Sequence, residues 1–142
     1  MKCILVPFDG YRAAKRALEH AIRLAKGARD VTLHLVNVEP DLDDRGMVGA
    51  YLTRSRHRKI MGERARDVLG AAEQRLKAVR LRHQSHIAYG DPARAIVRAA
   101  RRFGCDAIVM GTRGLGAIGG MLLGSVATKT IHLSPVPVTL VR

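Results

Sequence analysis

The chain has 142 residues, 47% of them hydrophobic, and two cysteines, so it is long enough to bury one core without a framework of disulfides. Its first apolar run stops at Asp9, which is too short for a signal peptide or a membrane span. We therefore expect a single domain over residues 1–142, soluble, cytoplasmic and without membrane association. The formal net charge of +13 favours salt-sensitive attraction to polyanions. Aromatic residues make up only 4% of the chain, however, which weighs against a surface that stacks nucleic-acid bases.

Short apolar runs alternate with segments of helical period along the whole chain. Strands are predicted over residues 2–7, 31–38, 84–88, 106–110 and 136–141, and helices over 12–26, along an apolar stripe from 61 to 79, from 92 to the glycine at 104, and over about 125–133. The stretch Glu39–His57 has no clear period and is expected to be a long loop, with Asp41, Asp43 and Asp44 as a solvated acidic turn. This alternation predicts an α/β fold: an open, doubly wound, Rossmann-like parallel sheet of five strands. We expect the strand order 3-2-1-4-5, which would make the first and fourth strands neighbours.

Local signals place several further side chains. Asp91 and Pro92 are expected as the N-cap and the first residue of the third helix. Cys3 and Cys105 should lie near the same ends of adjacent strands and stay reduced, because side chains so placed seldom meet the geometry of a disulfide. None of the six histidines has metal-ligand spacing. The histidines of the third strand, at 83 and 86, would point to opposite faces and are expected at solvent or at an interface.

Glycines cluster after the fourth strand, where the same letters spell more than one motif. The run Gly114–Gly119 matches the dinucleotide pattern GxGxxG, but that pattern should follow the first strand and precede an acid for the ribose. The chain has no Asp or Glu after Asp106, so this interpretation is rejected. The run Gly119–Ser125 looks like a Walker A loop without the lysine that reaches the phosphates, and it is rejected as well.

The remaining pattern is Gly111-x2-Gly114-x9-Gly124-Ser125. With it, the chain resembles the ATP-binding subclass of the universal stress protein family, whose signature is G-x2-G-x9-G-[S/T]. The resemblance covers the whole chain and includes the opening ILVPFDG, the later GDPARAI and DAIVMGTRG, and the closing GSVATKTIHLSPVPVTLVR. The chemistry agrees, because glycines let backbone approach a ligand closely and the N-terminus of a helix after Gly124 attracts an anion.

The resemblance implies a site for ATP, with Mg²⁺ or Mn²⁺ on its phosphates beside Asp9. Asp9 would bind the ribose hydroxyls, and the backbone at Val38 would read the edge of the adenine. The full set expected to contact the nucleotide is Pro7, Asp9, Val38, Met110, Gly111, Arg113, Gly114, Gly124, Ser125 and Val126. Backbone of the last four would hold the phosphates. From its place in the loop, Arg113 is expected either to pair with a phosphate or to face solvent. Tyr11 departs from the family, which often has Ser or Thr after the first Asp-Gly, and this puts the contacts at the first helix cap in question.

The resemblance also implies a homodimer in which the last strands of two subunits, Val136 to Val141, pair with each other. We expect a stress-response signalling protein with at most slow ATP hydrolysis, because the sequence shows no activated nucleophile, no paired carboxylates and no Walker B acid. No catalytic residue and no resident metal site is assigned. The alternatives are an ATP-hydrolysing or nucleotidyl-transfer enzyme of related fold, and a basic protein that interacts with nucleic acid through its arginines.

Overall fold

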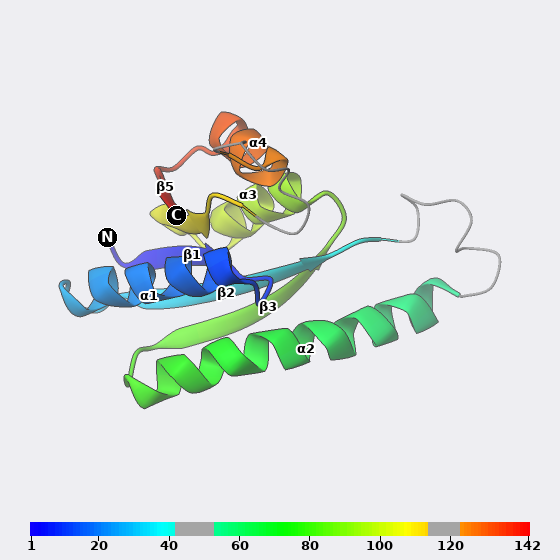
Figure 1. The fold of residues 1–142 in the computed structure, drawn as a ribbon, viewed down its shortest axis with the longest axis horizontal. Coiled ribbons are helices and arrows are strands. Elements are labelled where there is room, and N and C mark those ends of the chain that lie inside the picture. Colours follow the sequence, from blue (N-terminus) through cyan, green and yellow to red (C-terminus); the bar gives the residue numbers. More distant parts are fainter. Residues whose placement is uncertain (42–52, 114–122) are drawn as a thin grey trace.

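The structure, a computed structural model, describes residues 1–41, 53–113 and 123–142. Parallel strands form one sheet in the order β3-β2-β1-β4-β5, and helices lie on both of its faces (Figure 1). The predicted fold class and strand order are thus confirmed. The elements are β1 (Cys3–Pro7), α1 (Arg12–Lys26), β2 (Thr32–Glu39), α2 (Arg54–Ala78), β3 (His83–Tyr89), α3 (Pro92–Arg102), β4 (Ala107–Gly111), α4 (Ser125–Leu133) and β5 (Val138–Val141). Within the three described ranges, every helix is too short or too polar to serve as a membrane span.

Two hydrophobic cores cover the two faces of the sheet, because successive residues of a strand point to opposite faces. Ile4 and Val6 of β1 belong to the core that α1 and α2 cover, together with the buried alanines of α1. Cys3 and Leu5 belong to the core on the other face, which includes Ala127 of α4 and the buried side of α3. Burial on both faces explains why the inner strands read as continuous apolar runs rather than as alternating ones.

Helix α1 packs closely on the sheet because most of its buried side chains are alanine methyl groups. The chain enters this helix through Gly10, whose φ of +84° is rarely open to other residues. The closest approach is to the end of β4. A Cβ atom at Gly111 would lie 2.6 Å from the Cβ and 2.8 Å from the backbone carbon of Ala13, so packing of the protein itself requires glycine at this position.

The loop predicted over Glu39–His57 is shorter than expected. Glu39 is the last residue of β2, and α2 begins at Arg54, so the prediction is wrong at both ends of the segment. Thr53 provides the reason at the second end, because its hydroxyl accepts a hydrogen bond from the N–H of Arg56 at 3.2 Å and so caps the helix. Residues 42–52 lie outside the described part of the chain.

The predicted apolar stripe of α2 is confirmed in part, because Ala65, Ala72 and Leu76 are buried as expected. Its other three members, Met61, Val68 and Val79, are only half-buried, and Gly62 and Leu69 complete the buried face instead. At the end of the chain, β5 starts at Val138, two residues later than predicted. The Ser134 hydroxyl contacts both the N–H and the carbonyl of Val136, at 3.2 and 2.7 Å, and this local turn delays the strand.

His86 of β3 is half-buried against other rings, so its expected place at solvent or at an interface is wrong. Its ring is stacked on that of Phe103, with ring centroids 3.7 Å apart, and on that of His34 at 5.1 Å. The other histidine of this strand, His83, has its Nδ1 2.9 Å from the carbonyl of Leu81. Partners far apart in the sequence decide the position of His86, and the alternation of one strand does not show them.

The contact between α1 and β4 predicts that Gly111→Ala lowers the free energy of unfolding by about 1–3 kcal/mol, as overpacking does elsewhere. Gly70→Ala is the matched control, because a Cβ atom at this position of α2 would meet nothing within 4 Å. Since alanine favours a helix over glycine, this variant should gain about 0.5–1 kcal/mol. Urea unfolding of both variants measures the difference, and a Gly111→Ala protein as stable as the wild type would contradict the packing described.

Candidate functional site

The predicted site residues lie where strands β1, β2 and β4 end. In a doubly wound sheet, ligands bind beyond the carboxyl ends of the strands, where the strand order reverses. Here that point is between β1 and β4, which are neighbours in the sheet. Pro7 is the last residue of β1, Gly111 is the last residue of β4, and Val38 is the last but one of β2. The topology therefore brings the expected segments to one edge.

The N-terminus of α4 is fastened to this edge by a backbone hydrogen bond. The N–H of Gly124 donates to the carbonyl of Thr112 at 2.7 Å, and the N–H of Thr112 donates to the carbonyl of Val141 of β5 at 3.0 Å. Gly124 is the N-cap, and no side chain among the described residues caps this helix. The N–H groups of Ser125 and Val126 have no partner within a helix at these positions, and the helix dipole adds positive potential around them. This arrangement suits a phosphate group.

Asp9 lies exposed just beyond β1. Its Oδ1 accepts a hydrogen bond from the N–H of Tyr11 at 2.9 Å. Tyr11 is the N-cap of α1 and makes no side-chain cap hydrogen bond. Because Tyr11 stands where the family often has Ser or Thr, the side chain that accepts a hydrogen bond at the start of this helix is that of Asp9. Within the described residues only one carboxylate oxygen of Asp9 has a partner, which leaves the other for a ligand hydroxyl.

The other predicted site residues differ in how far their side chains are buried. The side chain of Met110 is buried in the core under α3 and α4, so only its backbone can reach a ligand. Val38 and Val126 are half-buried against the same core. Arg113 is exposed, and Gly114 lies outside the described residues. The contact of each residue in the set with a nucleotide stays a prediction.

Asn37 is a site residue that the sequence reasoning missed. Its side chain is buried, and its amide Nδ2 donates to the carbonyl of Phe8 at 2.9 Å, which ties β2 to the segment between Pro7 and Asp9. Its Oδ1 is a buried acceptor without a partner in the described part of the chain. A lone asparagine inside an apolar strand is the signal that could have found it, because buried polar groups need hydrogen bonds.

The first turn of α3 is tied to α4 beside this edge. As predicted, Asp91 is the N-cap of α3, accepting from the N–H of Arg94 at 3.0 Å, and Pro92 is the first helical residue. The second carboxylate oxygen of Asp91 pairs with Nζ of Lys129 at 3.0 Å. The hydrogen bond from Arg94, followed by that from Lys129, lowers the pKa of Asp91. This exposed pair is a second link between α4 and the rest of the domain, besides the bond from Gly124 to Thr112.

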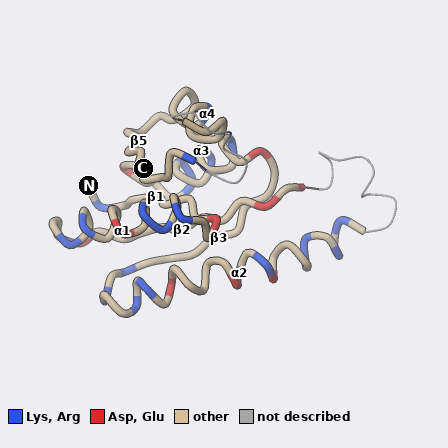
Figure 2. Tube along the Cα trace, in the orientation of Figure 1, with Lys and Arg blue, Asp and Glu red and all other residues tan. Residues whose placement is uncertain are grey.

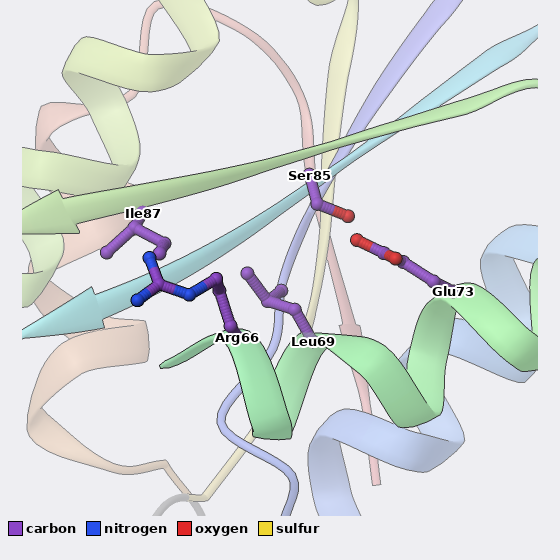
Figure 3. Close-up of a pocket in the computed structure, with 5 residues that line it drawn as sticks. All are labelled: Arg66, Leu69, Glu73, Ser85 and Ile87. Carbon is purple, nitrogen blue, oxygen red and sulfur yellow. The ribbon is translucent and has the colours of Figure 1, made fainter. Parts of the chain in front are cut away.

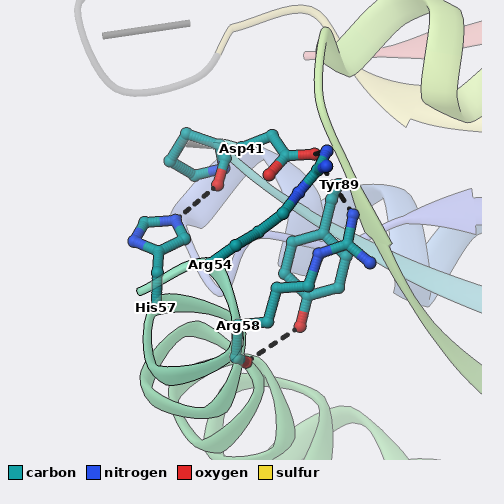
Figure 4. A network of polar contacts seen from close by, with 6 residues as sticks. Asp41, Arg54, His57, Arg58 and Tyr89 are labelled. Atoms are coloured by element: carbon teal, nitrogen blue, oxygen red, sulfur yellow. Dashed lines mark hydrogen bonds and ion pairs between the residues drawn. The ribbon is translucent and has the colours of Figure 1, made fainter. Parts of the chain in front are cut away.

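Beyond β2 and β3, a polar network joins the strand ends to the start of α2 (Figure 4). Asp41 pairs with Arg54 at 3.4 Å and with Arg58 at 3.2 Å, so the expected solvated acidic turn is wrong for this residue. The guanidinium of Arg58 lies 4.8 Å from the ring centre of Tyr89, whose hydroxyl donates to the Arg58 carbonyl at 3.1 Å. The other two acids of that predicted turn lie outside the described residues.

The excess positive charge is spread along several helices. Figure 2 shows Lys and Arg at intervals on α1, α2 and α3, with acidic residues between them on α1 and α2. Some of these cations are paired: Arg75 of α2 binds both carboxylate oxygens of Glu19 of α1, at 2.6 and 2.8 Å. The hydrogen bond from Arg75 lowers the pKa of Glu19. A spread of this kind raises the general potential for anions without marking one face for nucleic acid.

A pocket of about 470 Å³ lies elsewhere, between α2 and β3 (Figure 3). Its lining consists of Arg66, Leu69, Glu73, Ser85 and Ile87, none of which belongs to the predicted nucleotide set. The side chains of Glu73 and Ser85 point toward one another from facing elements. The pocket is therefore separate from the edge where the glycine-rich segment lies.

Comparison with known proteins agrees with this geometry. The model of the universal stress protein family matches residues 1–142. The chain belongs to the universal stress protein family. A universal stress protein of Thermus aquaticus is 38% identical over 143 residues, which cover 99% of this chain and 98% of the relative.

Solved structures of the family have the same fold. The structure of protein MJ0577, a universal stress protein of Methanocaldococcus jannaschii, superposes with a TM-score of 0.86 at 27% identity, over 99% of this chain and 94% of that one. A family protein from Arabidopsis thaliana with AMP bound gives a TM-score of 0.69 over 99% of this chain and 91% of that one. At its 18% identity, this second likeness shows the fold alone.

Proposed function

We propose that this universal stress protein binds ATP at the carboxyl edge of the sheet and acts as a cytoplasmic signalling protein in the stress response. The observation that carries the proposal is the uncapped N-terminus of α4, held at the end of β4 by the hydrogen bond from Gly124 to Thr112. It offers backbone N–H groups where the fold places ligands. No acid lies in the first turn of α4 to repel a phosphate.

In the proposed complex the phosphates lie on the N–H groups of Ser125 and Val126, and Gly114 supplies further backbone. The N–H of Gly124, which was expected to join them, donates to Thr112 and instead positions the helix. Asp9 accepts from the ribose hydroxyls, and the backbone at Val38 contacts the adenine. The family neighbour from Arabidopsis supports an adenine nucleotide in this fold, since it holds AMP. Magnesium or manganese on the phosphates would neutralise part of the charge of a triphosphate, with the exposed carboxylate of Asp9 beside them.

Hydrolysis in this site should be slow. Fast phosphoryl transfer needs a group that orients the attacking water and further groups that stabilise the charge of the transition state. Two of the described acids near this edge are engaged elsewhere, Asp41 with arginines and Asp91 with Lys129. A third, Glu39, is buried, and this burial raises its pKa. The proposed role is therefore the holding of a nucleotide rather than rapid turnover.

The variant Ser125→Pro tests the proposal without disturbing the helix. Proline is well tolerated at the first helical position, where its missing N–H has no helical partner, and the extended backbone of Gly124 (φ −74°, ψ 161°) suits the residue before a proline. The variant removes one N–H donor to the phosphates. Because a hydrogen bond to a charged group contributes about 1.5–3 kcal/mol, calorimetry should show ATP binding weakened about ten- to hundredfold.

Ser125→Ala is the matched control, since it removes only the hydroxyl and keeps the backbone donor. Its ATP affinity should fall less than that of Ser125→Pro, while both proteins keep the melting temperature of the wild type. Equal ATP affinity in the wild type and in a folded Ser125→Pro protein would show that the N-terminus of α4 does not hold the phosphates.

We further propose that two copies pair through β5 to form a homodimer. This strand is the last of its sheet and pairs with β4 on one side, and all of its residues are half-buried in the single chain. An apolar strand at an open sheet edge favours pairing with another strand. Nearby, Ile131 and Leu133 of α4 are exposed by 42% and 37%. Light scattering after size exclusion should give twice the chain mass of 15.5 kDa at micromolar concentration, and the mass of one chain would contradict the dimer.

A further inference from the structure

Three metal-binding side chains meet at the amino-terminal edge of the sheet, at the opposite ends of the strands from the proposed nucleotide site. Cys3 opens β1, His34 lies in β2, and Cys105 lies just before β4. All three are buried, and their ligand atoms lie within 4.8 Å of one another. Two thiols with an imidazole are a donor set typical of zinc.

We propose that Cys3, His34 and Cys105 bind one Zn²⁺ ion, with water at the fourth position. Bonds of about 2.3 Å to sulfur and about 2.0 Å to nitrogen place the ligand atoms of a tetrahedral zinc site roughly 3.5–3.8 Å apart. Side-chain rotations that move the ligand atoms by about 1 Å would bring the three atoms to these separations. On binding, each thiol releases its proton to solvent, and two thiolates balance the charge of the ion. The buried complex is then neutral overall, which avoids the cost of burying an isolated charge.

The backbone around both cysteines is fixed in advance. The carboxylate of Asp106 accepts from the N–H groups of Lys2 at 2.6 Å and of Cys3 at 2.9 Å, and the N–H of Asp106 donates to the carbonyl of Cys3 at 2.9 Å. The N–H of Cys105 donates to the carbonyl of Ala100 at the end of α3, also at 2.9 Å. These bonds hold the two thiols on one side of the sheet, so little ordering is left for the metal to impose.

His86 is placed to support the zinc-binding histidine. A metal-bound imidazole usually donates its second N–H to a neighbouring group, which fixes its orientation. The Nδ1 atom of His34 lies 3.0 Å from the Nε2 atom of His86, so Nε2 of His34 binds the metal while its Nδ1–H donates to His86. The ring of Phe103 lies against both imidazoles, with centroids 5.1 Å from His34 and 3.7 Å from His86. In this arrangement His86 is a positioning residue.

Titration of the reduced, metal-free protein with Co²⁺ tests the site, because the visible spectrum of Co²⁺ depends on its coordination geometry and Zn²⁺ has no such spectrum. We expect one equivalent of Co²⁺ to give the visible bands of a tetrahedral ion and thiolate-to-cobalt charge transfer in the near ultraviolet. One equivalent of Zn²⁺ should abolish both. A spectrum of the hydrated ion throughout the titration at micromolar protein would overturn the proposal.

Substitutions separate the ligands from their support. Cys105→Ser and His34→Gln should each weaken Co²⁺ binding by about a hundredfold or more, and His86→Gln should weaken it by about tenfold while keeping the tetrahedral spectrum. The control is His132→Gln, on the exposed side of α4, which should change nothing. Full Co²⁺ affinity in a folded Cys105→Ser protein, or an equal loss in His132→Gln, would overturn the assignment.

A measurement on the wild type tests the ligands even where a cysteine variant does not fold. Zinc should protect both cysteines of the native protein from a disulfide reagent, in proportion to the zinc bound up to one equivalent. Equal thiol reactivity with and without zinc would contradict the proposed ligands. Circular dichroism of each variant identifies those that keep the fold.

Discussion

The parallel pairing of β1 with β4 is the constraint on which both edges of the sheet depend. These strands are far apart in the chain, since Cys3 and Asp106 differ by 103 in residue number, yet Ile4 lies beside Ala107 and Leu5 beside Ile108. Because the strands are parallel, the same pairing brings their carboxyl ends together at one edge and their amino ends at the other. Gly111, Gly124 and the loop after β1 lie at the first edge, and the two cysteines meet at the second.

Close packing on this strand pair accounts for the small residues at particular positions of the sequence. Helix α1 covers β1 and β4 with small side chains, and it approaches the end of β4 so closely that a Cβ atom at Gly111 would overlap Ala13. A glycine that is expected for a ligand is thus also needed by the core. On the far side of β4, the hydrogen bond from Gly124 to Thr112 and the ion pair of Lys129 with Asp91 fix where α4 begins. The direction of the α4 dipole at the edge follows from these contacts.

Features set by neighbours in the chain could be predicted from the sequence. Alternating apolar runs and helical periods were enough for the order of the elements and the doubly wound fold class, and the pair Asp91 and Pro92 marked the start of α3. The start of α4 at Ser125 also followed from local signals. Features set by distant partners could not be predicted in this way. Asp41 is placed by Arg54 and Arg58, and His86 is placed by His34 and Phe103. The metal-ligand cluster unites three separate segments and has no spacing motif.

The central claim is that the carboxyl edge of this universal stress protein holds ATP. It is tested most directly by mass spectrometry of the small molecules released when freshly purified protein is denatured, with calorimetric titration of the nucleotide-free protein alongside. The account predicts an adenine nucleotide among the released molecules and saturable binding of added ATP at one site per chain. Release of no adenine nucleotide, together with no heat of binding from ATP in the presence of Mg²⁺ or Mn²⁺, would contradict it.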